Sequence, residues 1–386
     1  MDDDETAFSA RVVENIATIP PDTWARLAGD SNPFVSYPFL LALEETSCAS
    51  NEAGWLARHL VVEESSGDII AAAPAYLKSH SQGEYVFDHA WASAWERAGG
   101  RYYPKMQVAA PFSPVSGPRL LAGNGPVSKE SRLVLLRALE TVCQKLDLSS
   151  VHVTFCTKHD YEVMGVAGWV QRIGRQFHWY NRDYTKFDDF LAALTSRKRK
   201  MIRRERHQVA DQGISVSPLS GDDIKSHHWD AFYRFYVDTY DRKWGYPYLT
   251  REFFEALQDR MGESIVLIMA TMEELPVAGA LNLRGATALY GRNWGCLGDY
   301  RFLHFEACYY QAIEFAIDNG LKTVEAGTQG PHKIQRGYEP VQTYSGHYIP
   351  NESFREAVER FCREEEREVE WELKKYSDHL PYRQAD

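Results

Sequence analysis

The sequence predicts an α/β protein of two similar halves, with a long basic helix between them and a second long helix at the C-terminus. The chain has 386 residues, which exceeds a typical single domain. Two regions repeat the same order of apolar strands and helices. Between them, "SRKRKMIRRERH" (196–207) holds seven lysines and arginines against one glutamate, although the formal net charge of the chain is -11.

In the first half, "SYPFLLALEE" (36–45) predicts a helix, because apolar residues follow the proline that opens it. The segment "HLVVEESSGDIIAAAPAYLK" (59–78) predicts two strands joined by a short turn, and "EYVFDHAWAS" (84–93) predicts a third strand carrying Trp91. A helix over "SRLVLLRALETVCQKLD" (131–147) and a strand over "VHVTFC" (151–156) follow.

The second half repeats this order. A helix is predicted in "GYPYLTREFFEAL" (245–257), two strands in 265–285, and a third strand with Trp294 in "ALYGRNWG" (288–295). A helix over "FEACYYQAIEFAIDNG" (305–320) and the strand "TVEAG" (323–327) complete it. The halves differ in one respect, because the first inserts "RYYPKMQVAAPFSPVSGPRLL" (101–121) before its second helix.

The linking segment and the C-terminus are predicted as helices. The linker, over 186–212, has Asp188 and Asp189 in its first turn, and Gly213 ends it. The C-terminal helix is mostly acidic. We therefore predict a first domain over 8–170, a second over 171–350 that contains the basic helix, and a C-terminal helical segment over 351–386.

Composition excludes several classes of protein. The six cysteines are scattered without a C-x-x-C pair, which favours reduced thiols over disulfides or a zinc site. No metal site is predicted, since H-E-x-x-H is absent, and the absence of G-x-S-x-G argues against a serine hydrolase. The chain shows no signal peptide and no apolar run of about 18 residues, so we expect a cytoplasmic protein without a membrane span. Its oligomeric state is not indicated.

The basic helix predicts contact with a polyanion. Seven cations cannot be neutralised by one glutamate in the same helix, so phosphates or the acidic C-terminal helix are equally good partners. The candidate phosphate- or tRNA-binding residues are Arg197, Lys198, Arg199, Lys200, Arg203 and Arg204.

Several segments resemble the FemAB-like transferases, in a branch that has two fused acetyltransferase-type (GNAT) domains. They are the helix "FDDFLAALTSRKRKMIRRERHQVADQGISV", "YYPKMQVAAPFSPVSGPRLL", "WGYPYLT", "GRNWGC", "LHFEACYYQAIEFAI" and "EAGTQGPHKIQRGYEPV". The resemblance covers about 31–350. It implies two tandem GNAT-like domains and an acyltransferase, which takes an aminoacyl group from a charged tRNA and transfers it to an amine on a cell-wall precursor or a small molecule.

Two alternatives stay open. One is an acyl-CoA-dependent N-acetyltransferase, although neither "CLGDYRFLHFEA" (296–307) nor "GNGPVSKESRL" (123–133) has the Q/R-x-x-G-x-G/A spacing that cradles a pyrophosphate. The other is a non-catalytic RNA- or phosphate-binding module on a transferase fold. No cofactor is expected, because the donor is itself a substrate.

The candidate catalytic residues lie in "GTQGPHKIQRGYEP" (327–340), a loop that directly follows a strand. Fem relatives carry a Phe-Lys-x-Gly-Phe-Gly motif here, and this resemblance implies that Lys333 lies near the reacting carbonyl. His332 replaces an aromatic residue and is either a base or a backbone-bonded loop histidine. Glu325 either orients these groups or pairs with Arg336, itself a candidate substrate-binding residue beside three glycines.

Further candidates for substrate binding lie in three other segments. We expect Trp244, Tyr290, Arg292 and Lys333 to bound a cleft for a nucleoside or sugar with its phosphate, and simple packing is an equal alternative for each. Tyr103 and Lys105 match the acceptor-side loop of the resemblance. The full set beyond Arg336 is Arg242, Lys243, Trp244, Tyr290, Arg292, Tyr103 and Lys105.

Overall fold

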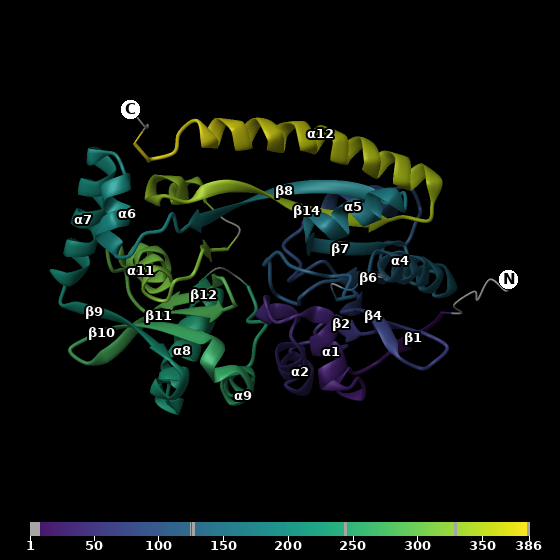
Figure 1. Cartoon of the computed structure of the whole chain (residues 1–386), viewed down its shortest axis with the longest axis horizontal. Coiled ribbons are helices and arrows are strands. Elements are labelled where there is room, and N and C mark those ends of the chain that lie inside the picture. The colour runs from purple at the N-terminus through teal and green to yellow at the C-terminus, as the bar shows by residue number, and fades with distance from the viewer. Residues whose placement is uncertain (1–7, 124, 126–127, 243–244, 328–329, 384–386) are drawn as a thin grey trace. The chain divides into compact units, whose positions relative to one another are not determined.

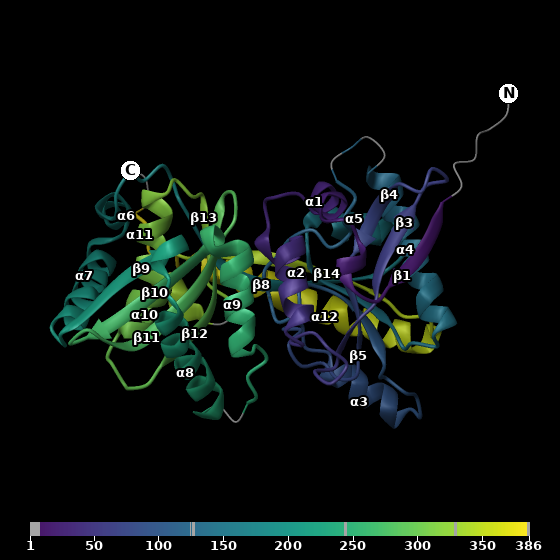
Figure 2. The ribbon, with the colours of Figure 1, turned by 90° about the horizontal axis from the view of Figure 1, so that it is seen from below.

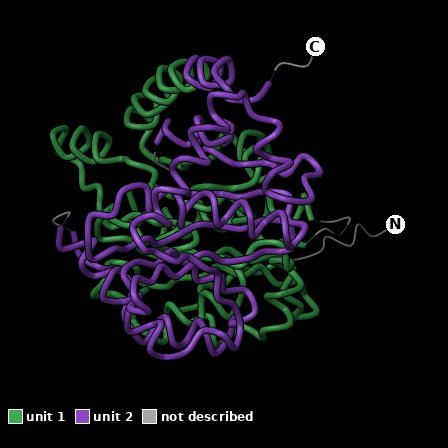
Figure 3. The backbone as a smooth tube through the Cα atoms, turned by 90° about the vertical axis from the view of Figure 1, so that its left-hand side faces the viewer, with its two compact units in different colours: residues 1–174, 342–370 green, residues 175–341, 371–386 purple. Residues whose placement is uncertain are grey.

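The computed structural model describes residues 8–123, 125, 128–242, 245–327 and 330–383. Contacts between Cα atoms divide the chain into two compact units (Figure 3). Unit 1 comprises residues 1–174 and 342–370, and unit 2 comprises 175–341 and 371–386. Within the described ranges, no helix is both long and apolar enough to cross a bilayer.

This division differs from the predicted boundaries at the C-terminal end. Strand β14 (Glu339–Tyr348) returns to unit 1, where residues 344–348 pair with β7 (Val151–Cys156). Helix α12 (Glu352–Ser377) is shared between the units. Its early residues Phe354 and Val358 pack in a unit 1 core cluster, so this part of the helix is not a separate segment.

Unit 1 contains a small antiparallel sheet and the strand order β2-β5-β6-β7-β14 (Figure 1). The small sheet is β1 (Ser9–Val13), β3 (His59–Glu63) and β4 (Ile69–Ala73), and the other strands are β2 (Trp55–Ala57), β5 (Ala75–Lys78) and β6 (Lys105–Val108). Its helices are α1 (Pro21–Ala28), α2 (Tyr37–Glu45), α3 (His89–Arg97), α4 (Ser128–Lys145) and α5 (Lys158–Val166). Leu135, Leu136 and Leu139 of α4 form the core with Val151 and Val153 of β7.

The third strand predicted at 84–93 is wrong, because this segment contains helix α3. Trp91 lies on the helix and meets His347 edge-on, with ring centroids 4.9 Å apart. The strand at this place in the sheet is β6, which comes from the inserted segment and runs parallel to β7. The insertion therefore supplies part of the sheet.

Unit 2 has the strand order β8-β13-β12-β11-β10-β9 (Figure 2). The strands are β8 (Val170–Tyr180), β9 (Ile214–Ser220), β10 (Ile265–Met272), β11 (Leu275–Arg284), β12 (Ala288–Cys296) and β13 (Thr323–Glu325). All neighbours are antiparallel except β12 and β13, which are parallel. A right-handed helical crossover is the normal way to join such a parallel pair.

Helices cover both faces of the unit 2 sheet. A helical segment of α10 (Leu303–Phe305), a π-helix (Glu306–Tyr310) and α11 (Gln311–Asp318) packs against one face, and α8 (Ser226–Arg242) with α9 (Arg251–Met261) covers the other (Figure 1). Helix α8 comes so close to β12 that a Cβ on Gly295 would lie 2.3 Å from the carbonyl oxygen of Phe235. Only glycine permits this approach.

The basic segment forms two helices, α6 (Phe187–Ala193) and α7 (Ser196–Ala210), and not the single helix predicted over 186–212. Leu194 between them is extended and bridges Tyr382, while the Thr195 amide donates to the Pro381 carbonyl. Because the C-terminal residues pair with this joint, the backbone there cannot continue as a helix.

Candidate functional site

A cavity of about 100 Å³ lies in unit 2, where the parallel strands β12 and β13 separate. Their pairing ends at Tyr290 and Glu325, and β12 continues without this partner. The lining comprises Ala280, Leu281, Asn282, Gly291, Arg292, Asn293, Trp294, His304, Cys308, Tyr309 and Ala326. The lining is aromatic and polar, as is usual for small-ligand sites.

A β-bulge lies next to this gap, in the pairing of β12 with β11. The register between β11 and β12 shifts, so that Asn282 pairs with Gly291 and Leu281 pairs with Asn293. Arg292 is the extra residue, and a bulge turns neighbouring side chains out of simple alternation. Arg292 and Asn293 consequently both line the cavity.

The π-helix supplies the opposite wall of the cavity. Its wider turn separates two sets of side chains, because Cys308 and Tyr309 line the cavity while Tyr310 and Glu306 bond to α7. π-Helical turns occur frequently at functional sites. This one connects the cavity wall to the basic helix.

Behind Tyr309 lies a 3₁₀-helix over Pro331–Arg336, which carries three of the predicted residues. The Nε2 of His332 lies 2.9 Å from the Tyr309 hydroxyl oxygen. Burial, followed by the charges of Arg336 and Lys333, lowers the pKa of His332. Gly330 has a φ of 104°, and a Cβ there would lie 2.1 Å from Cε1 of His332, so glycine permits the ring position.

Lys333 is 1% exposed and lies outside the cavity lining. Its Nζ donates to the carbonyl oxygens of Ala326 at 2.5 Å and Gly327 at 2.8 Å. Burial lowers the pKa of Lys333 to about 7. Lys333 therefore supports the chain at the end of β13, just behind Ala326, and its catalytic assignment stays a prediction.

Arg336 joins the 3₁₀-helix to α7. Its Nη2 lies 3.0 and 2.9 Å from the two carboxylate oxygens of Glu205, and its Nε donates to the Tyr310 hydroxyl at 2.9 Å. The predicted alternative of a pair between Glu325 and Arg336 is wrong, because the single glutamate of the basic helix takes this position. Glu325 instead has a carboxylate oxygen 3.7 Å from Nε2 of His178.

The cations of α7 divide into paired and unpaired sets. Lys198 donates to Gln335, Arg203 pairs with Asp188, and Arg206 pairs with Glu306 and Glu314. Among the acidic side chains that the structure describes, none forms an ion pair with four members of the cluster. These four are Arg197, Arg199, Lys200 and Arg204.

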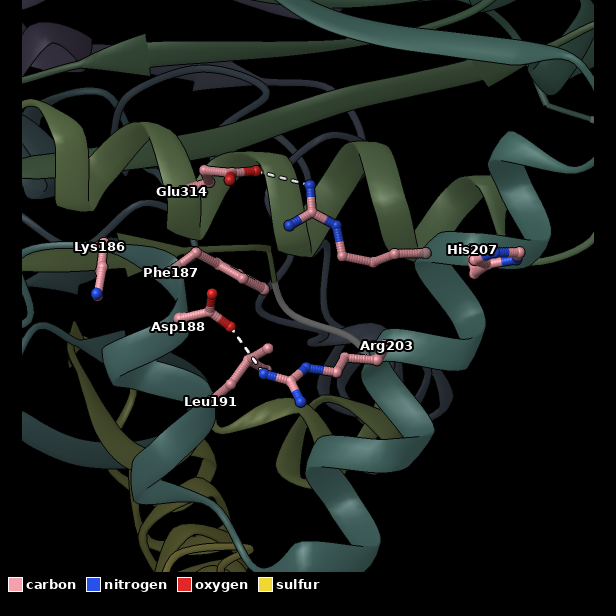
Figure 4. Close-up of a pocket in the computed structure, with 8 residues that line it drawn as sticks. Lys186, Phe187, Asp188, Leu191, Arg203, His207 and Glu314 are labelled. Atoms are coloured by element: carbon pink, nitrogen blue, oxygen red, sulfur yellow. Dashed lines mark hydrogen bonds and ion pairs between the residues drawn. The ribbon is translucent and has the colours of Figure 1, made fainter.

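A second cavity, of about 530 Å³, lies between α6, α7 and α11 (Figure 4). Two arginines that line it are paired with acids: Arg203 with Asp188 at 2.9 Å (Figure 4), and Arg206 with Glu314 at 2.6 Å. Arg206 also covers the Phe187 ring at 4.6 Å. The charges of these two arginines are offset, so each attracts an anion less than an unpaired cation of α7 does.

The remaining predicted residues of unit 2 are spread around the sheet. Tyr290 is buried next to the bulge, and burial raises its pKa. Arg242 ends α8 and bonds to Asp238 and the Cys296 carbonyl. Lys243 and Trp244 lie outside the described residues, so the expected cleft of Trp244, Tyr290, Arg292 and Lys333 stays a prediction.

Tyr103 and Lys105 belong to unit 1, where they enter a buried polar network. The Lys105 ammonium donates to Ser81 at 2.9 Å, to Glu84 at 2.6 Å and to Asp88. Tyr103 shares a 2.8 Å hydrogen bond with Ser81. In the part of the chain that the structure describes, no group of three or more His, Cys, Asp or Glu side chains is placed to hold a metal ion.

The sequence missed Tyr309, His304 and Cys308 as candidate site residues. Their amphipathic spacing indicates a core helix, and a π-turn has no signature in such spacing. The repeated pattern predicts Trp294 on a strand and gives it no role in a site. The nearest available signal was "LHFEACYYQAIEFAI", which carries part of the family resemblance.

A family model described as peptidoglycan biosynthesis/recognition matches residues 15–384. The chain belongs to the FemAB-like family. This match spans both units, and the predicted resemblance is confirmed. A search of the curated proteins finds no match to this FemAB-like chain.

Solved structures confirm the tandem GNAT fold. FemX has a TM-score of 0.56 at 12% identity and covers 91% of this chain and 100% of its own. A tandem GNAT protein from the clavulanic acid biosynthesis pathway has a TM-score of 0.50 at 9% identity, and the match covers 89% of this chain and 99% of that protein. L-PGS from Bacillus licheniformis has a TM-score of 0.51 at 11% identity, and the match covers 87% of this chain and 98% of that protein. At these identities the likeness establishes the fold alone.

Proposed function

We propose that this FemAB-like protein is an acyltransferase that moves an aminoacyl group from a charged tRNA to an amine. The family description favours a cell-wall precursor as the acceptor, with a small amine as the other candidate. FemX, the tandem GNAT protein and L-PGS share the tandem GNAT fold, and this fold is compatible with acyl transfer. The reaction then belongs in the cytoplasm, where charged tRNA is found.

The observation that carries this proposal is the set of unpaired cations on α7. Arg197 and Lys200 lie on the outer side of a helix whose inner side holds Glu205. Glu205 pairs with Arg336, and Arg336 lies four residues from His332, which bonds to Tyr309 on the cavity wall. A polyanion bound to α7 therefore lies next to the element that supports the cavity.

The loop before α10 gives little support to acyl-CoA as the donor. A pyrophosphate needs free backbone amides at the start of this helix. Here the Leu303 amide donates to the Tyr300 carbonyl at 3.3 Å, and the Phe305 and Glu306 amides donate to the Phe302 carbonyl at 2.9 and 3.0 Å. Three amides of this turn therefore already have partners.

The test is acyl transfer by the purified full chain. Bulk tRNA charged with radiolabelled amino acids is incubated with a panel of amines that includes a cell-wall precursor, and acetyl-CoA replaces the tRNA in a parallel series. Transfer from charged tRNA that falls at least tenfold in Arg197→Gln/Lys200→Gln/Arg204→Gln supports the proposal. Transfer from acetyl-CoA alone, or RNA binding without any transfer, refutes it in favour of the two alternative functions.

A further inference from the structure

We infer that Tyr309 is the proton-transferring residue of the unit 2 cavity and that His332 takes the proton through it. This inference rests on the proposed acyl transfer, and it assigns the chemistry to a tyrosine that no motif indicated. Lys333 then has a supporting role.

The geometry separates the two candidates for the proton transfer. Tyr309 lines the cavity, whereas Lys333 does not. Two of the three donors of Lys333 are used on the Ala326 and Gly327 carbonyls. An ammonium held in this way fixes the wall at Ala326 but does not meet a molecule inside the cavity.

The hydrogen bond between Tyr309 and His332 gives a proton a path from the cavity wall to the 3₁₀-helix. Burial raises the pKa of Tyr309, so its hydroxyl keeps its proton. Burial and two neighbouring cations lower the pKa of His332, so its ring is neutral. Because these shifts oppose a separate phenolate and imidazolium, the phenol gives its proton to the electron pair on Nε2 only while its oxygen takes a proton from the molecule in the cavity.

Acyl transfer in this cavity forms one bond and breaks one. The acceptor nitrogen forms a bond to the acyl carbon, and the ester C–O bond of the donor breaks. One proton leaves the nitrogen for the Tyr309 oxygen, while the Tyr309 proton moves to Nε2 of His332. The imidazolium returns a proton by the same route to the leaving oxygen, which yields an amide and an alcohol and restores both side chains.

The remaining contacts of His332 fix this arrangement. Its backbone carbonyl accepts from Nη1 of Arg336 at 3.0 Å, and its ring lies 5.8 Å from Phe305, centroid to centroid. Gly330 leaves room for the ring, as described above. Substitution of Gly330 by alanine therefore moves the His332 ring without removing any of its atoms.

The kinetic experiment uses the charged-tRNA and amine assay, with Tyr309→Phe, His332→Gln and Lys333→Met in the full chain. General acid–base catalysis contributes about 10²–10⁴-fold, so Tyr309→Phe is expected to lower kcat by about 10²-fold with little change in KM. In the wild type, kcat/KM rises with pH as His332 loses its proton. In His332→Gln the rise of kcat/KM with pH is expected to be absent. In Gly330→Ala the same rise is expected to occur at a different pH.

Tyr348→Phe is the matched control. It removes a hydroxyl that accepts from Gln144 at 2.7 Å in unit 1. Its kcat is expected to stay within about twofold of the wild type, because the loss of a tyrosine hydroxyl outside the cavity does not affect the reaction. The inference is overturned if Tyr309→Phe behaves like this control, or if Lys333→Met alone removes the rise of kcat/KM with pH.

A second measurement needs no substrate. Nitrogen-15 NMR of histidine-labelled protein, assigned with His332→Gln, gives the tautomer of His332. The expected form carries its proton on Nδ1, and Tyr309→Phe is expected to shift the Nε2 resonance. A proton on Nε2 overturns the inference, whatever the assay shows. If no donor supports transfer while the Nδ1 tautomer is found, the proposed function fails and the Tyr309–His332 arrangement stands.

Discussion

Each unit of this protein buries one lysine from the predicted site, and the two lysines have opposite surroundings. Lys105 in unit 1 meets two carboxylates, and those charges raise its pKa although burial opposes them. Lys333 in unit 2 donates to two backbone carbonyls and forms no ion pair with the described acids, and burial lowers its pKa to about 7. A buried ammonium with two counter-ions stays charged, while one without them exchanges its proton near neutral pH.

The two units also differ in what lies beside their parallel strand pairs, β6–β7 in unit 1 and β12–β13 in unit 2. In unit 1, Arg119 is fully buried beyond the β6–β7 pairing and donates to the Thr154 carbonyl at 3.1 Å and the Val115 carbonyl at 2.6 Å. In unit 2 the corresponding gap between β12 and β13 is a cavity. A buried arginine therefore lies beside the parallel pair of unit 1, whereas a cavity lies beside the parallel pair of unit 2.

The largest expected effect tests the unit 1 network. Lys105→Met leaves Glu84 and Asp88 buried without their shared cation, and breaking a buried ion pair costs roughly 3–5 kcal/mol. We expect a loss of about this size in the free energy of unfolding, measured with urea and circular dichroism. The triple variant Lys105→Met/Glu84→Gln/Asp88→Asn is expected to recover most of it. A triple variant as unstable as the single one would contradict this account.

The second test is the pH dependence of stability in unit 2. The pKa of Lys333 falls from 10.5 to about 7 on folding, so the folded state binds fewer protons than the unfolded state between these values. The free energy of unfolding therefore rises from pH 7 to 10.5 and is lowest below pH 7, where the buried lysine is charged; the total change is roughly 5 kcal/mol.

Lys333→Met removes the group that produces this dependence. Its unfolding free energy, followed by urea titration at several pH values, is expected to lack the rise seen in the wild type. At pH 6 the loss of a buried charge raises the unfolding free energy of the variant. The loss of the donor to the Ala326 and Gly327 carbonyls lowers it. An unchanged rise above pH 7 in the variant would show that Lys333 is not the titrating group.

The sequence predicts the fold well and the site partly, for physical reasons that particular residues illustrate. Apolar periodicity predicts α11, because its inner face is continuous, and the run of charged residues predicts α12. It fails at Trp91, where a tryptophan in an apolar run looks the same on a helix as on a strand. It also fails at Leu194, because a pairing with Tyr382, far along the chain, breaks the basic helix.

The site shows the same limit. The loop motif predicts that Lys333 and His332 lie on one element, and the structure places both on the 3₁₀-helix. Which of them approaches the cavity depends on the π-turn at Tyr309 and the bulge at Arg292. Both features are set by packing between elements, and neither leaves a local pattern in the sequence.

The third test compares one glycine from each gap. In unit 1, a Cβ on Gly117 would lie 2.1 Å from Nδ2 of Asn32, which is buried and donates to the Ser116 carbonyl at 2.9 Å. Gly117→Ala is expected to cost about 2–3 kcal/mol of unfolding free energy, as overpacking does. In unit 2, a Cβ on Gly291 would meet nothing closer than the Asn282 Oδ1 at 3.3 Å.

Gly291→Ala is therefore expected to change stability by less than about 1 kcal/mol, while it narrows the cavity and lowers transfer about tenfold. Urea titration and the charged-tRNA assay give the two readouts for both variants. The comparison fails if Gly117→Ala impairs transfer without destabilising the protein, or if Gly291→Ala does the reverse.

The smallest expected effect separates cations that differ only in pairing. Arg204 on α7 forms no ion pair with the described acids, while Arg203 beside it pairs with Asp188 at 2.9 Å. Arg204→Gln is expected to weaken tRNA binding a few-fold and to lower the slope of log K against log salt by about 0.7–0.9. Arg203→Gln is expected to lower the slope less, because Asp188 already offsets its charge. Arg97→Gln, an exposed arginine of α3 in unit 1, serves as the control for net charge. Equal slopes for all three variants would mean that the overall charge of the protein, and not the unpaired side of α7, governs its affinity for RNA.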